Sequence, residues 1–281
     1  MDKKNEYSVL TTEGNNEKSR NIDKMSSLDI ATLINSEDKT VPLAVEKAIP
    51  EIAAVIDICA EAIKNGGRIF YVGAGTSGRL GVLDASECPP TYGTSPEIVQ
   101  GIIAGGREAA FRAIEKAEDD TNSVIIQLKD SSFCEKDVCI GLSASGSAPC
   151  VKGALKYAKE LGAKTASIAC NVNPAAAEFA DVSIVAVVGP EVVSGSTRMK
   201  AGTAQKLILN MISTGAMVRI GRVIGNYLAY MRPTNKKLLD RAARIVMSQT
   251  DCEYELAVEA VKASNGQIID AIDSVKKQMN N

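Results

Sequence analysis

The sequence contains no histidine among its 281 residues. Imidazole is the base of Ser-His-Asp and Cys-His enzymes and a common metal ligand, so this absence excludes those mechanisms. Proton transfer would then depend on Glu, Asp, Lys, Tyr or Cys side chains. The seven cysteines include no Cys-x-x-Cys pair. That argues against a zinc site and a disulfide framework, and predicts that most cysteines are small buried residues.

The sequence also lacks an excess of charge of one sign and a long apolar run. Its 32 Lys and Arg nearly balance its 34 Asp and Glu, for a net charge of -2. Neither nucleic acid nor an acidic membrane surface is therefore expected as a partner. No apolar run reaches the roughly 18 to 20 residues of a membrane span, and residues 1–10 lack the apolar segment of a signal peptide. We predict a cytoplasmic protein.

The remaining composition, 45% hydrophobic and 23% charged, is enough for one large α/β domain with a small helical appendage. Residues 1–50 are expected to form an N-terminal arm with short helical pieces, because the first 40 are mostly polar. From Val41 to Ile63 the apolar positions step by three and four residues. This spacing predicts one buried helix face, which Pro50 kinks or restarts.

Residues 51–235 alternate short apolar runs with helical segments. The runs at 68–72, 137–142, 165–169 and 182–188 predict strands, and the first two each lead through a Gly- or Ser-rich loop into a helix. This alternation is typical of a three-layer α-β-α domain with a mainly parallel, flavodoxin- or Rossmann-like sheet. The apolar segment 201–220 predicts a helix buried in the core or in a subunit interface. Residues 236–281 predict a small helical C-terminal module.

Two of the predicted loops, residues 73–78 and 143–147, follow neighbouring strands and offer hydroxyls and backbone N–H groups at helix N-termini. Such loops favour a phosphate or sugar phosphate. One Gly-rich turn alone would be weak evidence, since many tight strand-to-helix connections use glycine. A dinucleotide fits less well: the glycines at 73, 75 and 78 match the spacing, but no ribose-binding acidic residue follows and the serine loop would have no role.

Carboxylates occur where two predicted helices end. Pro89 and Pro90 should stop one helix and place Glu87 in its last turn. A helix from about residue 110 to 117 should end at Glu118, Asp119 and Asp120. The negative end of a helix dipole raises carboxylate pKa values, which suits proton transfer near neutrality. The alternative is that these residues are only solvated helix ends.

Residues 189–200 bring a Glu, hydroxyls and two cations around Gly195, immediately before the predicted buried helix. One interpretation is a third wall of the anion site. The other is that Ser196 and Thr197 only cap the helix that follows.

Eight segments together resemble the N-acetylmuramic acid 6-phosphate etherase family, and the resemblance covers nearly the whole chain. They are residues 12–13, 34–38, 73–81, 84–91, 103–106, 118–120, 195–203 and 234–238.

The resemblance implies a homodimer of sugar-isomerase (SIS) domains with a small, UBA-like C-terminal domain and no cofactor or metal. The implied reaction, a step of cell-wall sugar recycling, releases D-lactate from N-acetylmuramic acid 6-phosphate and leaves N-acetylglucosamine 6-phosphate. It assigns Glu87 as the general acid and Glu118 as the second catalytic carboxylate, most simply the base at C2. The residues it places at the substrate are Gly75, Thr76, Ser77, Ser143, Ser145, Gly146, Ser147, Ser196, Thr197 and Lys200.

One loop departs from the family pattern. Where the family usually has Ala-Ser-Gly-Arg-Thr-Pro-Tyr, residues 144–150 read Ala-Ser-Gly-Ser-Ala-Pro-Cys. Losing an Arg and a Thr hydroxyl should weaken phosphate binding, although backbone donors and serines remain. We expect the fold and carboxylates to be intact and the affinity or substrate preference to have shifted.

Two other functions remain open. A sugar-phosphate-sensing regulator similar to glucokinase regulatory proteins would share the Gly-rich loop, but those proteins carry two such domains. An aldose-ketose isomerase would suit the same fold and would also use a carboxylate base. Lactate release from the muramic acid phosphate separates all three.

Overall fold

The computed structural model describes residues 10–228, 230–231, 233 and 235–279. The first nine residues and Thr234, on which sequence-based expectations fell, lie outside that part. The chain divides into two compact units: Met1–Ser86 with Glu97–Ala216, and Glu87–Pro96 with Met217–Asn281. The boundaries expected after residues 50 and 235 stay predictions. Each unit is described by itself.

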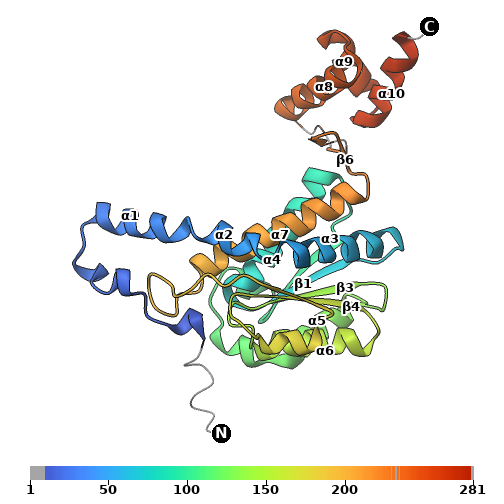
Figure 1. Cartoon of the computed structure of the whole chain (residues 1–281). Helices are drawn as coiled ribbons and strands as arrows, with labels where there is room; N and C mark the ends of the chain where they lie inside the picture. Colours follow the sequence, from blue (N-terminus) through green and yellow to red (C-terminus); the bar gives the residue numbers. More distant parts are fainter. Residues whose placement is uncertain (1–9, 229, 232, 234, 280–281) are drawn as a thin grey trace. The chain divides into compact units, whose positions relative to one another are not determined.

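A parallel sheet forms the centre of the first unit (Figure 1). Its strands are β1 (Ile69–Gly73), β2 (Val99–Ile103), β3 (Val138–Leu142), β4 (Lys164–Ala169) and β5 (Val182–Val185). They lie in the order β2-β1-β3-β4-β5 with every pairing parallel. The predicted α/β class is confirmed. Sequence analysis missed β2, whose Gln100 and Gly101 interrupt its apolar residues at the sheet edge.

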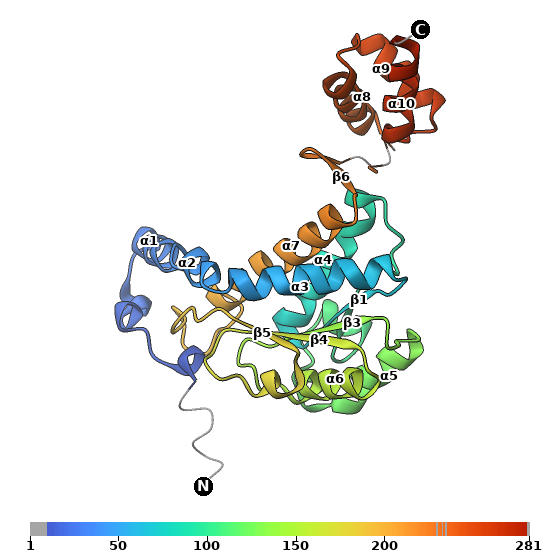
Figure 2. The same cartoon turned by 45° about the vertical axis from the view of Figure 1, so that its right-hand side comes forward.

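Helices cover both faces of this sheet (Figure 2). On one face, α5 (Thr121–Asp130) and α6 (Pro149–Glu160) enclose a core that includes Phe70 and Val72 of β1. On the other face lie α3 (Ile49–Lys64) and α4 (Gly75–Tyr92), with α7 (Lys200–Arg219) beside α3. Tyr71 points to this second face, where a Cβ on Gly81 of α4 would meet it. The alternation along β1 follows from the pleat of a strand that is buried on both sides.

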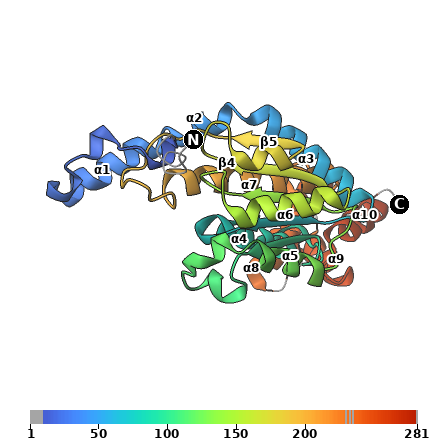
Figure 3. The ribbon, with the colours of Figure 1, turned by 90° about the horizontal axis from the view of Figure 1, so that it is seen from below.

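Within the described residues, the N-terminal arm consists of three 3-10 turns and two helices. It contains the 3-10 turns η2 (Thr11–Glu13), η3 (Glu17–Ser19) and η4 (Ile22–Lys24), then α1 (Ser27–Asp38) and α2 (Val41–Glu46). Figure 3 shows α1 projecting away from the sheet. Pro50 lies in the first turn of α3, where its missing N–H costs nothing. The proline therefore starts a new helix after α2.

Two predicted helix ends are wrong. Helix α4 continues through Pro89 and Pro90 to Tyr92, so Glu87 is not in its last turn. The buried side chains of Cys88 and Tyr92 offset the loss of two backbone donors. The segment before Glu118 is not an α-helix but two 3-10 turns, η5 (Arg107–Ala110) and η6 (Glu115–Asp119). Asp120 instead caps the start of α5, accepting from the N–H groups of residues 122 and 123.

The second unit holds the antiparallel pair β6 (Val223–Ile224) and β7 (Tyr227–Leu228) and three C-terminal helices. These are α8 (Lys236–Thr250), α9 (Tyr254–Ala263) and α10 (Ile268–Met279). Their apolar faces form a core of their own that includes Val246, Val261 and Ile272. Across the described residues, no helix is both long enough and apolar enough to cross a bilayer.

Candidate active site

The loop between β1 and α4 depends on two glycines that approach each other. A Cβ on Gly78 would lie 2.5 Å from the Gly73 carbonyl oxygen, and one on Gly73 would lie 2.8 Å from the Gly78 backbone N. Only glycine permits this approach. The chain therefore turns directly from the strand into the helix, and Thr76 and Ser77 lie in the first turn of α4.

Ser77 is fixed by a side chain from α7. Its hydroxyl donates a 2.9 Å hydrogen bond to Gln205 Oε1, and both residues are buried. Gln205 Nε2 has no hydrogen-bond partner among the described residues. Because the Ser77 proton is committed to Gln205, the lone pairs of its oxygen remain available as an acceptor.

The serine loop, residues 143–147, is held by its own hydroxyls. Ser145 Oγ lies 3.2 Å from Ser143 Oγ and 2.9 Å from Ser147 Oγ. Ser143 Oγ also accepts from the Gly146 N–H at 3.0 Å. Gly146 has φ +74°, and a Cβ there would collide with Pro174. The chain of hydroxyls ends where α6 begins, with no side chain capping that helix, as an anion site requires.

These two loops lie next to each other because Gly73 of β1 pairs with Leu142 of β3. The sheet order reverses between these strands, and α/β folds bind ligands at such a point. A cavity of about 430 Å³ opens there. Its lining residues are Glu13, Ala74, Gly75, Thr76, Ser77, Glu118, Asp119, Leu142, Ser143, Ala144, Ser145, Ser147, Ala148, Pro149 and Thr197.

Glu118 brings a proton-transfer group to this cavity. Burial raises the pKa of its carboxyl, and the neighbouring negative charge of Asp119 raises that pKa further. The helix dipole invoked from the sequence is not the cause, because no α-helix ends there. The direction expected for the pKa is nevertheless the direction found. A carboxylate with a raised pKa is a stronger base for a carbon-bound proton.

The segment before α7 contributes less to the cavity than its residue types suggested. Thr197 lines the cavity, and Ser196 does not. The start of α7 is capped by Glu191, whose carboxylate accepts from the N–H groups of Lys200 and Ala201, each at 2.9 Å. The capping function considered for Ser196 and Thr197 thus belongs to a buried glutamate.

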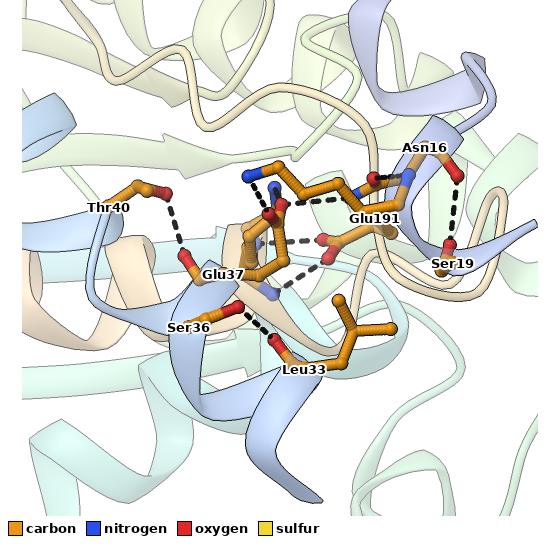
Figure 4. A network of polar contacts seen from close by, with 10 residues as sticks. Asn16, Ser19, Leu33, Ser36, Glu37, Thr40 and Glu191 are labelled. Carbon is orange, nitrogen blue, oxygen red and sulfur yellow. Dashed lines mark hydrogen bonds and ion pairs between the residues drawn. The ribbon is translucent and has the colours of Figure 1, made fainter. Parts of the chain in front are cut away.

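Lys200 does not line the cavity, in contrast to the substrate contact expected for it. Its ammonium lies 2.8 Å from Glu37 Oε2 at the end of α1, and both side chains are buried. Figure 4 shows Glu37, Asn16 and Glu191 in one network of polar contacts. Asn16 Nδ2 and Lys18 Nζ also donate to the Glu37 carboxylate, at 2.8 and 2.9 Å. Lys200 therefore attaches the arm to the first turn of α7.

Two further predicted residues lie outside the cavity lining. Gly146 shapes the serine loop without facing the cavity. Glu87 is an exposed residue of α4, in the Glu87–Pro96 segment that belongs to the second unit. Its role as the acid stays a prediction. Among the described residues, no three His, Cys, Asp or Glu side chains cluster in a way that could hold a metal ion.

The structure adds Glu13 of the arm to the cavity, a residue that the sequence analysis did not place at the site. Its side chain is exposed and lines the cavity together with Glu118 and Asp119. The only signal in the sequence was its presence in one of the segments that carry the family resemblance. No spacing rule links a carboxylate in a polar arm to a loop 130 residues away.

Comparison with known proteins identifies the domain type and the family. Residues 51–159 match the glucokinase regulatory protein N-terminal SIS domain, and residues 125–214 match the SIS domain. The chain is 54% identical to an N-acetylmuramic acid 6-phosphate etherase of Clostridium beijerinckii, over 96% of this chain and 89% of the relative. It is 54% identical to that of Photobacterium profundum, over 96% and 90%. The etherase of Aeromonas hydrophila is 51% identical, over 95% of this chain and 90% of the relative.

The chain belongs to the N-acetylmuramic acid 6-phosphate etherase family. The resemblance found in the sequence is confirmed. The fold of this chain is similar to those of solved sugar isomerases. Phosphoheptose isomerase from Francisella tularensis gives a TM-score of 0.51 at 18% identity, over 69% of this chain and 100% of that one. The enzyme of the same name from Neisseria gonorrhoeae also gives 0.51 at 18%, over 68% and 98%. At this identity the likeness supports the fold alone.

Proposed function

We propose that this chain is a carbon–oxygen lyase that cleaves the lactyl ether of N-acetylmuramic acid 6-phosphate. The products are N-acetylglucosamine 6-phosphate and D-lactate. The observation that carries the proposal is the placement of Glu118, with its raised pKa, on the wall of the cavity that the two hydroxyl-bearing loops line. Relatives that are more than half identical over almost the whole chain carry the name of this activity.

The chemistry needs one base and one acid. In the opened sugar the C1 aldehyde acidifies the C2 proton, which Glu118 removes as its carboxylate. The electron pair forms a C2=C3 double bond while the bond from C3 to the lactyl oxygen breaks. The departing oxygen takes a proton from the acid, the role we propose for Glu87. Water then adds at C3 and a proton returns to C2, which restores both carboxyl groups to their starting states.

Binding would rest on neutral donors. We propose that Ser145 and Ser147, with the N-terminal turn of α6, hold the 6-phosphate. Thr76, Ser77 and Thr197 would contact the sugar. Oriented hydroxyls and backbone N–H groups at a helix N-terminus bind anions without a cation. This assignment is supported by the lining of the cavity.

The homodimer and the cytoplasmic location are also part of the proposal. Leu43 of α2, Ile49 of α3 and Met211 of α7 expose apolar side chains, 60%, 49% and 40% accessible, which a second copy would cover. A sugar that carries both a phosphate and a carboxylate does not cross a bilayer unaided, so its enzyme would work where the sugar is phosphorylated. Light scattering should give twice the 29.6 kDa chain mass. Leu43→Glu should lower that mass, while Leu161→Glu, immediately after the end of α6, should not.

The decisive experiment measures lactate release from N-acetylmuramic acid 6-phosphate. Glu118→Gln and Glu87→Gln should each lower kcat by about 100-fold or more. Glu108→Gln, an exposed carboxylate of η5, is the matched control and should be fully active. In heavy water the wild-type product should carry deuterium at C2, and in ¹⁸O-labelled water the new C3 hydroxyl should carry the label. No lactate from the wild type, or full activity in both Gln variants, would reject the assignment.

A further inference from the structure

We propose that Glu13 is a specificity residue, which accepts a hydrogen bond from a hydroxyl or N–H of the bound sugar. In this way the cavity would select an amino-sugar phosphate over a simple phosphate. The inference rests on the proposed function in one respect, the choice of an amino-sugar phosphate as the ligand. Three observations carry it: the anchoring of the arm, the unpartnered state of the Glu13 carboxylate, and the charge of the cavity.

The arm is anchored immediately before Glu13 by a single buried amide. Asn171 Oδ1 accepts from Thr11 Oγ1 at 2.7 Å and from the Thr12 N–H at 3.2 Å. Asn171 Nδ2 donates to Thr12 Oγ1 at 2.9 Å and to the Ala144 carbonyl at 3.1 Å. Asn171 and Thr12 are almost fully buried. One side chain thus joins the arm to the serine loop, and the backbone at residue 13 has a fixed place at the cavity.

The backbone on the other side of Glu13 is also held. Ser194 Oγ donates to the Gly14 carbonyl at 3.1 Å, and Gly14 packs against Pro190. Farther along the arm, Glu37 is bound by Lys200. These contacts fix the main chain and leave the Glu13 side chain out of the anchoring.

The Glu13 carboxylate has no hydrogen-bond or ion-pair partner among the described residues; only its backbone is bonded. Two other glutamates of the arm are paired, Glu17 with Arg20 and Glu37 with Lys200. A carboxylate is an acceptor only. A ligand group that binds the Glu13 carboxylate must therefore be a hydrogen-bond donor. An N-acetylhexosamine offers hydroxyls and an acetamido N–H.

The charge of the cavity makes this carboxylate unfavourable for an anion alone. Glu13, Glu118 and Asp119 all line it, and none of the described lining residues is Lys or Arg. A third negative charge weakens the binding of phosphate by repulsion in a partly enclosed space. It favours a ligand only if that ligand donates a hydrogen bond to it. A bond to a charged acceptor is stronger than one between neutral groups.

Calorimetry with two probes tests this on the full chain. Glu13→Ala should raise the Kd of N-acetylglucosamine 6-phosphate by about tenfold or more, while the Kd of inorganic phosphate stays constant or falls. Glu13→Gln keeps a neutral acceptor and should recover part of the sugar affinity. Glu17→Gln removes the same charge from the same arm and should change neither ligand.

Equal weakening of both probes by Glu13→Ala would mean that the site had collapsed, and would overturn the inference. Unchanged affinity for both would overturn it too. The affinity ratio does not depend on turnover. If the wild type binds the sugar phosphate but releases no lactate, the proposed function fails and the role of Glu13 is still decided by that ratio. If the wild type does not bind N-acetylglucosamine 6-phosphate, the inference about Glu13 fails, and lactate release alone decides the proposed function.

Discussion

Lys200 Nζ lies 2.8 Å from Glu37 Oε2, with 3% and 7% of the two side chains exposed. The pair joins residues 163 positions apart in the sequence, at the first turn of α7 and the last turn of α1. Glu191 binds the backbone N–H of the same lysine. The arm and the start of α7 are therefore attached to each other at one buried point.

Removing the lysine side chain should destabilise the protein strongly. Lys200→Met leaves the buried Glu37 carboxylate with only Lys18 and Asn16, and breaking a buried pair on one side costs about 3 kcal/mol of unfolding free energy. Urea unfolding measures this loss. Arg20→Met removes the cation of the exposed pair with Glu17 and should cost less than about 1 kcal/mol. Equal losses in the two variants would contradict the buried attachment.

The attachment of the arm should depend on pH in the acid range. Burial raises the pKa of Glu37, but hydrogen bonds from Lys200, Lys18 and Asn16 outweigh it and lower the pKa from 4.5 to about 2. A lowered carboxyl pKa stabilises the folded state fully above pH 4.5, and this contribution disappears as the pH falls toward 2. Pepsin cleavage within residues 25–45 should accelerate over that interval. Glu37→Gln should make cleavage faster at pH 4.5 and less dependent on pH, and an unchanged profile would refute the linkage.

The pH profile of lactate release should report the environment of Glu118. Burial and the charge of Asp119 raise the pKa of its carboxyl. Glu118 therefore becomes an active base only at a pH above the ordinary pKa of a glutamate. Asp119→Asn removes the second cause and should move the acid limb of kcat/KM to lower pH. Asp130→Asn, at the far end of α5, alters the same charge away from the cavity and should leave the limb in place. A limb that does not move in Asp119→Asn would exclude Glu118 as the titrating group.

The altered serine loop should be improved by restoring a hydroxyl. Ala148 lines the cavity, and the residue is 3% exposed, in the core cluster that includes residues of α6. Ala148→Thr adds a donor for the phosphate, and we expect KM for the sugar phosphate to fall severalfold with kcat little changed. Thermal unfolding of the variant checks that the larger side chain fits. A well-folded variant with an unchanged KM would remove the explanation.

Much of the fold could be predicted because it depends on local patterns. Continuous apolar runs followed by Gly- or Ser-rich loops identified β1 and β3, and their neighbouring loops form the cavity. Strand β2 was missed because Gln100 and Gly101 break the apolar run at an edge position. Helix α4 was predicted to stop too early because packing of Cys88 and Tyr92 overrides the local effect of Pro89 and Pro90.

The site could be predicted only in part, because residue type does not give a partner. The strand order predicted only that the Gly-rich and serine loops are neighbours. The family resemblance placed Glu118 at the same site, and in the structure Glu118 lines the cavity with the serine loop. Lys200 was expected at the substrate because a lysine beside hydroxyls suits an anion, and its pairing with Glu37 is a tertiary contact. Glu13 reaches the cavity only through Asn171, a buried amide that no periodicity singles out.

The bonds from Asn171 to Thr11 and Thr12 span 160 and 159 residues, a long loop for the chain to close. During synthesis the arm leaves the ribosome early, yet its anchor is made more than half a chain later. The wall of the cavity that carries Glu13 thus cannot be anchored before residue 171 has been made. A nascent chain shorter than about 170 residues would hold the Gly-rich and serine loops without the carboxylate that faces them from the arm.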